Sequence, residues 1–227
     1  MLYIIPTPIG NLEDITLRAL RLLKDSDLIL SEDTRNSKKL LNHFEIKTSI
    51  KSYHMHNEHR ILPAILDKLK QGKTLCLISD AGTPGISDPG FLLIRSCIQA
   101  DIPLECLPGA TAFVPALIQS GLPTHEFTFI GFLPKKKGRK KKIKDLSKEY
   151  RTTVLYESSH KLLRTLYDLK EQLGLEKYLV VCRELSKKFE EILRGSLQES
   201  ITHFEGQPPR GEFVLVLDAP AKKISIS

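Results

Sequence analysis

The sequence lacks the signals that mark several classes of protein. It has no tryptophan, no apolar leader behind a basic start, and no apolar run of the roughly 18 residues that a membrane helix needs. We therefore predict neither a signal peptide nor association with a membrane. Hydrophobic residues make up 41% and charged residues 27% of the chain, which is typical of a globular protein.

Cysteine is scarce and is not arranged for metal binding. The four cysteines have no C-x-x-C spacing, and three lie in apolar runs. This pattern favours buried free thiols over metal ligands, so we predict no metal site and a cytoplasmic location. The cysteines are Cys76, Cys97, Cys106 and Cys182.

The glycine-rich fingerprints of phosphate-binding folds are also absent. Neither G-x-x-x-x-G-K-[ST] nor G-x-G-x-x-G occurs, and the first candidate loop has a single glycine, Gly10. Without a nest of backbone amides there is no evident diphosphate cradle, which argues against a P-loop nucleotidase or a nicotinamide dehydrogenase. A ligand that carries an adenosine but no phosphate fits better, and S-adenosyl-L-methionine is such a ligand.

Positive charge is concentrated in one segment. Residues 135–148 hold nine basic residues and one acidic residue, so their net charge of +8 (9 − 1) exceeds the net charge of +7 of the whole chain. Such a segment attracts polyanions, so we predict a mobile basic loop that binds RNA, with a solvated loop as the alternative. The predicted RNA contacts are Lys135, Lys136, Lys137, Arg139, Lys140, Lys141 and Lys142.

Strand-like and helix-like segments alternate along the chain, which predicts an α/β fold. In the first half, apolar runs at 2–5, 27–30, 50–53, 74–78 and 104–107 alternate with helical patterns and predict a mostly parallel sheet. In the second half, strand-like runs at 127–133, 152–158, 178–184, 189–195 and 212–218 crowd together and predict a mixed sheet. Turn-forming residues at 120–126 predict two α/β domains, 1–120 and 121–227.

Ligands of open α/β sheets bind at the carboxyl ends of the strands, where five segments of the first domain should converge. These are "PTPIGNL", "SEDTRNS", "YHMHNEH", "SDAGTPGISDPG" and "PGATA". In the fourth, we expect Asp80 to accept hydrogen bonds from an ammonium or hydroxyl group, with Gly82 and Gly85 allowing close approach of the backbone. The alternative is that Asp80 caps a turn. For Asp88 we favour a cap on the following helix, with Pro89 at its first position.

Several motifs together carry a family resemblance. "PTPIGNLEDIT", "EDTR", "SDAGTPGISDPG", "LPG", "GFLP", "YES" and "PPRGEFVLV" occur in this order between Leu2 and about Leu217. The chain thereby resembles the class III, tetrapyrrole-methylase-like methyltransferases, and within them the subfamily that acts on small-subunit ribosomal RNA. "TPIGNL" and "SDAGTPGISDPG" are the most specific of these motifs.

The resemblance implies two α/β domains with S-adenosyl-L-methionine in the cleft between them. It implies methylation of a cytidine ribose 2′-hydroxyl in the decoding region of small-subunit (16S) ribosomal RNA, free or in the assembled small subunit, by a homodimer. The cofactor contacts that it implies are Pro8, Ser79, Asp80, Thr83, Thr111, Ala112, Glu157 and Leu185. "PGATA" replaces the "PGP" form common in relatives. Many members continue after the position of "DAPAKKISIS" with a C-terminal helical segment, and we expect no RNA contact from such a segment here.

Proton removal from a ribose hydroxyl would benefit from a nearby base. The candidates are Asp33, His54, His56 and Glu58. Arg35 is a candidate for a phosphate contact or for a partner of Asp33. His54 and His56 are two residues apart, but without a third ligand they do not predict a metal site.

Two further motifs and two other functions stay open. Glu157 has an interdomain ion pair as its alternative role. Arg183, Glu184 and Arg210 are phosphate contacts or simple ion pairs. A methyltransferase of this fold that acts on a protein or small molecule is the near alternative, against which the lysine run argues. A non-enzymatic RNA-binding protein is the distant alternative, which would not need the cofactor loops and would show more aromatics for stacking.

Overall fold

The computed structural model describes residues 1–219 and divides the chain into two compact α/β units, Met1–Thr111 and a second that begins at Ala112. The boundary therefore precedes helix α5 (Phe113–Ser120), instead of following it at residue 120 as the turn formers suggested. Helix α5 belongs to the second unit because it packs on that unit's strands β7 (Thr152–Ser158) and β10 (Glu212–Leu217). The last residues of the predicted 121–227 domain lie outside the described part.

The first domain is built on a five-stranded, entirely parallel sheet with the order β3-β2-β4-β1-β5. Each strand overlaps a predicted run, which confirms the mostly parallel sheet. The strands are β1 (Leu2–Ile4), β2 (Leu28–Ser31), β3 (Ile50–Ser52), β4 (Leu75–Ile78) and β5 (Leu104–Cys106).

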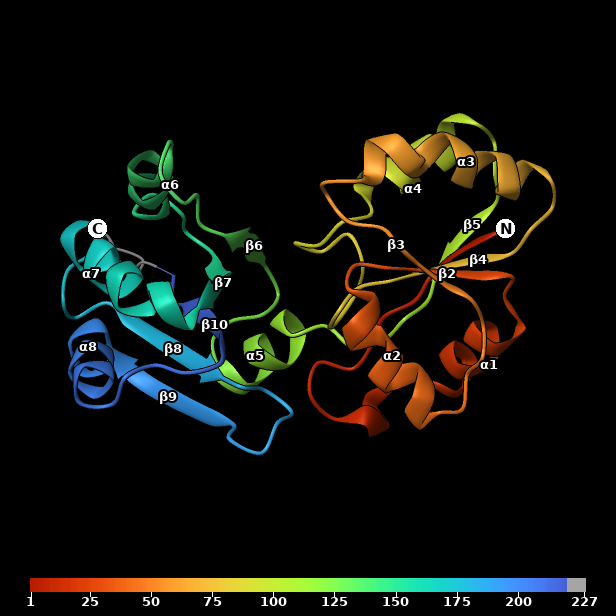
Figure 1. Cartoon of the computed structure of the whole chain (residues 1–227). Coiled ribbons are helices and arrows are strands. Elements are labelled where there is room, and N and C mark those ends of the chain that lie inside the picture. The colour runs from red at the N-terminus through yellow and green to blue at the C-terminus, as the bar shows by residue number, and fades with distance from the viewer. Residues whose placement is uncertain (220–227) are drawn as a thin grey trace. The chain divides into compact units, whose positions relative to one another are not determined.

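Helices cover both faces of this sheet, with α3 and α4 on one face and α1 and α2 on the other (Figure 1). Side chains of β4 alternate between the two cores: Leu75 and Leu77 pack toward α3 and α4, while Cys76 and Ile78 pack toward α1 and α2. The helices are η1 (Leu12–Asp14), α1 (Leu17–Asp25), α2 (Thr34–His43), α3 (Glu58–Lys70) and α4 (Phe91–Gln99).

The cysteines and helix caps of the chain test two sequence predictions. Cys76, Cys97 and Cys182 are buried free thiols, as predicted, whereas Cys106 is exposed.

Helix α4 begins at Phe91 with Gly90 as its N-cap, so the predicted cap by Asp88 is wrong. Gly90 has a φ of +146°, and a Cβ there would lie 3.2 Å from Leu77 Cδ2, so close packing on β4 fixes where this helix starts.

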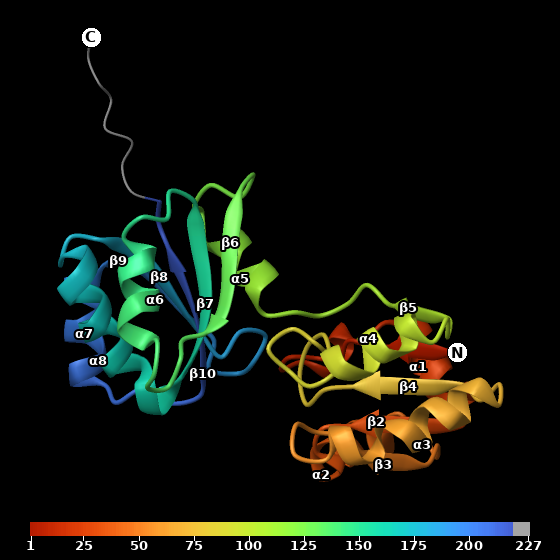
Figure 2. The ribbon, with the colours of Figure 1, turned by 90° about the horizontal axis from the view of Figure 1, so that it is seen from above.

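The second domain has a mixed five-stranded sheet with the order β6-β7-β10-β8-β9, in which only β6 and β7 pair in parallel. Figure 2 shows α5 on one face of this sheet and α6, α7 and α8 on the other. The strands are β6 (Phe127–Phe132), β7 (Thr152–Ser158), β8 (Tyr178–Arg183), β9 (Glu191–Ser196) and β10 (Glu212–Leu217). The helices are α6 (Arg139–Leu146), η2 (Ser159–Lys161), α7 (Leu162–Leu173) and α8 (Leu197–Gly206).

The basic segment is not the loop that its charge suggested, because its larger part forms helix α6. Arg139, Ile143 and Leu146 follow helical spacing and are all buried, so the helix has an inward face despite its low apolar content. Its N-cap is Gly138, with a φ of +83°. The lysines of this helix are exposed, and the burial of its inward face outweighs the charge repulsion that favours a mobile loop.

Candidate functional site

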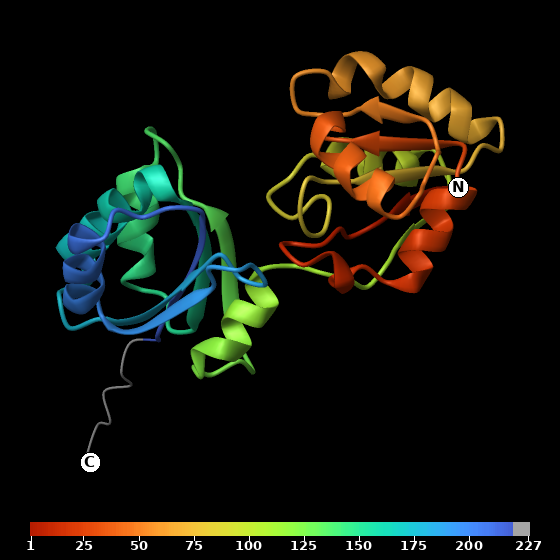
Figure 3. The same cartoon turned by 60° about the horizontal axis from the view of Figure 1, so that its bottom comes forward.

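The parallel sheet places the five loops that follow its strands at one edge of the first domain. Figure 3 shows the loops after β1 and β4, in red and yellow, on the same side of this domain. Thr7 and Gly82 exchange two backbone hydrogen bonds of 2.9 Å each. The Thr7 hydroxyl also donates to the Ser79 carbonyl at 3.1 Å. These contacts join the first and fourth loops into one surface.

The fifth loop is attached to the same surface. The Thr83 hydroxyl donates to the Ala110 carbonyl at 3.0 Å, and Gly109 lies directly against Pro6. A Cβ on Gly109 would be 2.7 Å from Pro6 Cβ, so only glycine fits at this crossing. The predicted contact residues Pro8 and Thr111 are half-buried in these loops, and Ala112 is the N-cap of α5.

Two of the predicted cofactor contacts have side chains that serve the loops themselves. Ser79 is buried and its hydroxyl donates to the Gly82 carbonyl at 3.2 Å. The Thr83 hydroxyl is occupied by Ala110. Each hydroxyl has used its one hydrogen, so Ser79 or Thr83 can contact a ligand as a hydrogen-bond acceptor or through backbone groups, but not as a side-chain donor.

The carboxylate of Asp80 is exposed and connects the fourth loop to the second. It accepts hydrogen bonds from the Asp33 backbone amide at 3.1 Å and from the Asn36 side-chain amide at 3.2 Å. Sequence reasoning did not identify Asn36. Its position in the first turn of α2, directly after a strand end, is the signal that could have found it.

Asp33 is committed to local structure. Its carboxylate caps α2 by accepting from the Arg35 amide at 2.9 Å, and it pairs with the Arg35 guanidinium at 2.7 Å. The hydrogen bonds from the Arg35 side chain and backbone lower the pKa of Asp33 to about 2. Asp33 is therefore a weak base, and the proposed pairing of Arg35 with Asp33 is the one that the structure contains.

Glu32 is the carboxylate that sequence reasoning missed. It directly follows β2 and is half-buried. Burial raises its pKa, and the neighbouring charge of Asp80 raises it further, against the weaker opposing effects of the Asp80 backbone amide and of His54. A carboxylate with a raised pKa at a strand end is a better proton acceptor than Asp33.

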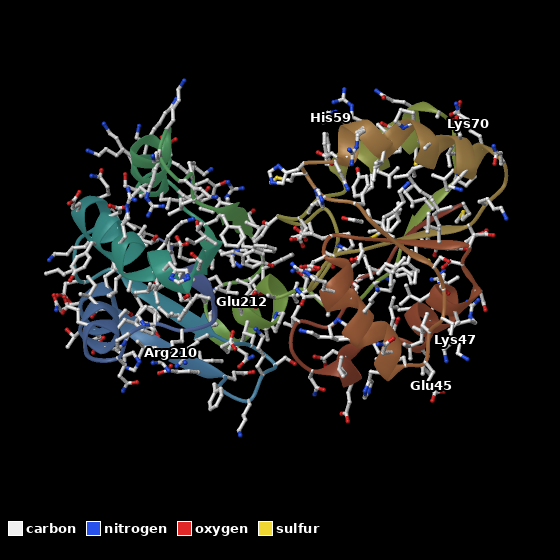
Figure 4. All side chains as sticks on the ribbon, in the orientation of Figure 1. Glu45, Lys47, His59, Lys70, Arg210 and Glu212 are labelled. Atoms are coloured by element: carbon white, nitrogen blue, oxygen red, sulfur yellow. The ribbon has the colours of Figure 1, made fainter. Side chains whose placement is uncertain are left out.

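The third loop forms a turn before α3. The His56 amide donates to His54 Nδ1 at 3.2 Å, and the two imidazole rings are 5.9 Å apart. Glu58 Oε2 accepts from the hydroxyl of buried Tyr53 at 3.3 Å, while His56 is exposed. His59, labelled in Figure 4, follows Glu58 in the first turn of the helix. Within residues 1–219, no three histidine, cysteine or acidic side chains form a group that could hold a metal ion.

In the second domain, the predicted residues Glu157 and Arg139 are members of one buried chain of polar contacts. Glu157 accepts from the Ser158 amide at 2.8 Å and from the Thr165 hydroxyl at 2.6 Å. Arg139 donates to that hydroxyl at 2.8 Å and to Asp168 at 2.7 Å. Glu157 and Arg139 are 3% and 4% exposed. Arg139 thus holds α6 against α7, and its prediction as an RNA contact is wrong.

The remaining basic and acidic candidates divide into paired and exposed groups. Arg183 pairs with Glu191 at 3.1 Å and donates to the Arg210 carbonyl, while Glu184 accepts from Lys187 at 2.9 Å. Leu185 is buried. Arg210 is exposed just before β10 (Figure 4), and so are six lysines of the basic segment. These are Lys135, Lys136, Lys137, Lys140, Lys141 and Lys142.

Comparison with known proteins gives the family. The sequence profile of the Tetrapyrrole (Corrin/Porphyrin) Methylases matches residues 1–200. The chain belongs to this family. Relatives named ribosomal RNA small subunit methyltransferase I include proteins from Halalkalibacterium halodurans (47% identical over 98% of this chain and 77% of that protein) and Synechocystis sp. (50%, 96% and 78%). Another is from Thermotoga maritima (44%, 95% and 97%).

Solved structures of methylases share the fold at low identity. A diphthine synthase has a TM-score of 0.75 at 13% identity, covering 96% of this chain and 89% of that one. A uroporphyrin-III C-methyltransferase from Thermus thermophilus, complexed with S-adenosylhomocysteine, has a TM-score of 0.67 at 18% identity, covering 95% and 96%. These likenesses confirm the tetrapyrrole-methylase-like fold. In the described part of the chain, every helix is too short or too polar to cross a membrane.

Proposed function

We propose that this chain is an S-adenosyl-L-methionine-dependent methyltransferase that modifies small-subunit ribosomal RNA, at the 2′-hydroxyl of a cytidine ribose in the decoding region. The observation that carries the proposal is the identity of 44–50% to proteins named ribosomal RNA small subunit methyltransferase I over at least 95% of this chain. The linked loops of the first domain support the presence of a ligand site, because they hold backbone and carboxylate groups in fixed positions.

The residues of these loops suit the proposed cofactor. The first, fourth and fifth loops contain no lysine or arginine, and they offer carbonyl oxygens and the exposed Asp80 carboxylate. Such acceptors match the ammonium and hydroxyl donors of S-adenosyl-L-methionine, and they disfavour the phosphates of ATP or NAD. Pro8, Ser79, Asp80, Thr83, Thr111 and Ala112 are the proposed contacts in and beside these loops, with Glu157 and Leu185 as proposed contributions from the second domain.

The protein has two chemical tasks, positioning and proton acceptance. Bound S-adenosyl-L-methionine would supply an electrophilic methyl group on a sulfonium. The chain must hold the ribose oxygen in line with that methyl at roughly 3 Å and accept the hydroxyl proton. We propose Glu32 for proton acceptance in place of Asp33, since Arg35 already neutralises Asp33. His56 and Glu58 remain alternative proton acceptors.

The exposed lysines are proposed to contact the RNA backbone. Lys140, Lys141 and Lys142 lie on the outer face of α6, whose inner face is fixed by Arg139. Lysines bind phosphates as point charges, so they would position the RNA without reading its sequence. We also propose that the protein is a homodimer and acts in the cytoplasm. Sedimentation of the purified chain tests the dimer.

Methyl transfer tests the function directly. Purified protein is incubated with S-adenosyl-L-methionine labelled on the methyl group and small subunits from cells that lack the gene, and the modified nucleotide is mapped. We expect label at one cytidine ribose. Label on a protein or small molecule, or on a base, would overturn the assignment.

Calorimetry tests the cofactor site separately. S-adenosylhomocysteine should bind and ATP and NAD should not. Asp80→Asn should weaken binding about tenfold to a hundredfold, because a charged hydrogen-bond acceptor is lost. Asp101→Asn is the matched control, since Asp101 is exposed before β5 begins, at the opposite sheet edge. Equal affinities of the two variants would exclude Asp80 from the site.

Salt dependence tests the lysines. Replacing Lys140, Lys141 and Lys142 with alanine should reduce RNA affinity and lower the slope of log K against log salt by about one for each lost phosphate contact. The control replaces the exposed Lys47, Lys68 and Lys70 of the first domain (Figure 4 labels Lys47 and Lys70). An unchanged slope in the α6 variant would remove these lysines from the interface.

A further inference from the structure

The second domain gathers aromatic side chains on one face of its sheet. Phe127, Phe129 and Phe132 of β6 pair in register with Thr152, Val154 and Tyr156 of β7, so all three phenylalanines point to the same side. Their spacing breaks the two-residue alternation of a strand. The register shift between Phe129 and Gly131 restores it, because a bulge adds one residue and returns Phe132 to the face of Phe129.

These rings contact one another in a continuous row. Phe113 of α5 stacks on Phe129 with ring centroids 4.7 Å apart, and Phe127 is 6.1 Å from Phe113. Tyr156 meets Phe129 at 5.1 Å and Phe132 at 5.6 Å, both edge to face. Four of the nine phenylalanines of the chain therefore hold each other in place at the sheet edge. We call Phe113, Phe127, Phe129, Phe132 and Tyr156 the aromatic row.

The aromatic row is a surface and not a core. Phe132 is 52% exposed and Phe127 is 37% exposed, and the other three rings are half-buried. None of the five belongs to the buried cluster on the opposite face, where Leu155 and Leu215 pack under α6, α7 and α8. Exposing large aromatic rings to water is unfavourable, so a group of them next to one another indicates a binding surface.

The chemistry that surrounds the row selects an occupant. Residues 127–144 contain no aspartate or glutamate, and Lys135 follows Phe132 by only three residues, so their Cα atoms are at most about 11 Å apart. Aromatic rings beside uncompensated lysines are the combination that binds single-stranded nucleic acid, with bases stacked on rings and phosphates held by cations. A protein partner would not require this excess of positive charge.

We propose that the aromatic row stacks unpaired bases of the RNA substrate while the adjoining lysines hold its phosphates. The inference rests on the proposed RNA substrate and adds a surface that recognises single-stranded rather than paired RNA. The rings are already ordered by their mutual contacts, so little conformational entropy is lost when a base stacks on them. Phe132, the most exposed ring and the one nearest to the lysines in sequence, is the primary stacking residue.

Oligonucleotides with and without bases test the inference. A short labelled RNA strand and an abasic strand of equal length are titrated with the wild-type protein and with a Phe127→Leu, Phe132→Leu variant. Leucine keeps apolar volume but removes the ring. We expect the variant to bind the natural strand about tenfold or more weakly, with the abasic strand and the salt slope unchanged. Phe189→Leu is the matched control, because Phe189 is 66% exposed in the same domain but lies outside the row.

The fluorescence of an introduced tryptophan detects base stacking directly. The chain contains no tryptophan, so Phe132→Trp and Phe189→Trp each carry a single reporter. Emission from Phe132→Trp should be quenched by the natural strand and not by the abasic strand, and Phe189→Trp should respond to neither.

The outcomes separate this inference from the proposed function. If the leucine variant binds both strands as the wild type does, the row takes no part in RNA binding and the inference is overturned. If the variant instead changes from dimer to monomer in sedimentation, with both strands affected equally, the row is an interface between copies of the chain and the inference is again overturned. A wild-type protein that binds no RNA of either kind would overturn the proposed function.

Discussion

In each domain the motifs gather at one end of that domain's own sheet, but the strand arrangement that brings them together differs. In the first domain every strand is parallel, so the five following loops meet at one edge regardless of strand order. In the second, Glu157 of β7 and Arg183 of β8 both lie opposite Phe213 of β10, and Arg183 lies opposite Glu191 of β9. The "YES", "CRE" and "PPRGE" motifs therefore gather at one edge only because antiparallel pairing brings strand starts and strand ends together.

The means of fixing the loops differ in the same way. In the first domain, backbone hydrogen bonds and the close approach of Gly109 to Pro6 hold three loops together. In the second, a buried arginine connects α6 to Thr165 and Asp168. The first arrangement is sensitive to added atoms, and the second to a lost charge.

The largest effect is expected from Arg139→Gln. The change leaves Asp168 without its buried partner and breaks the contact with Thr165, so we expect a loss of about 2–4 kcal/mol in the free energy of unfolding. Lys142→Gln, on the outer face of the same helix, should change it by less than about 0.5 kcal/mol. Urea titration of both variants measures the difference. Equal stabilities would mean that α6 does not depend on the contacts of Arg139 with Asp168 and Thr165.

Gly109→Ala tests the first domain by adding an atom to a tightly packed contact, whereas Arg139→Gln removes a charge. The added Cβ would stand 2.7 Å from Pro6 Cβ, so the first and fifth loops must separate, at a cost of about 1–3 kcal/mol. Affinity for S-adenosylhomocysteine should fall with it. Gly206→Ala is the control, because a Cβ there meets no atom within 4 Å and alanine favours the end of α8. An unaffected Gly109→Ala variant would show that the loops move independently.

The contrast between the sheets explains what could be predicted from the sequence. Apolar runs in the sequence predicted the ten strands that the structure describes in residues 1–219. Because the strands of the first sheet are parallel, the loops that follow them, including the loop of Asp80, could also be predicted to lie together. Helix α6 could not be predicted from the lysine count, because its stability comes from burying Arg139, Ile143 and Leu146 against the second domain. Tertiary packing of three residues outweighed local repulsion.

Other errors have the same origin. Asp33 and Glu32 are adjacent in sequence, and only the position of Arg35 distinguishes a neutralised carboxylate from one with a raised pKa. The end of the first domain at Thr111 depends on where α5 packs, which no turn-forming residue reveals. The aromatic row requires a bulge within β6, and overall aromatic content of 7% gave no indication of it.

Arg35→Gln tests the difference between the two neighbouring carboxylates. Without the guanidinium, the pKa of Asp33 should rise from about 2 toward its ordinary value of 3.8, as measured by NMR titration of the side chain. The depressed pKa stabilises the fold above pH 3.8, and this contribution is lost as the pH falls through about 2. The variant should therefore lose less stability than the wild type on acidification. A pKa of Asp33 that stays near 2 would assign the shift to the amide hydrogen bonds of α2.

The smallest effect on stability is expected for Glu32→Gln. The pKa of Glu32 is raised, whereas that of Asp33 is lowered, so the two carboxylates affect the pH dependence of stability in opposite directions. The raised pKa of Glu32 means that its ionised form is disfavoured in the folded state, so its contribution to stability is present below its unfolded value of 4.5 and lost as the pH rises through the folded value. Glutamine cannot ionise. The variant should therefore be slightly more stable than the wild type at neutral pH, where solvent screening keeps the difference small, and no more stable at pH 4. If Glu32 also accepts the ribose proton, the same variant is more stable at neutral pH yet transfers methyl groups more slowly, with cofactor affinity little changed. A variant that is less stable at neutral pH would mean that the Asp80 amide and His54 stabilise the ionised carboxylate more than burial penalises it, and the case for Glu32 over His56 or Glu58 would then be lost.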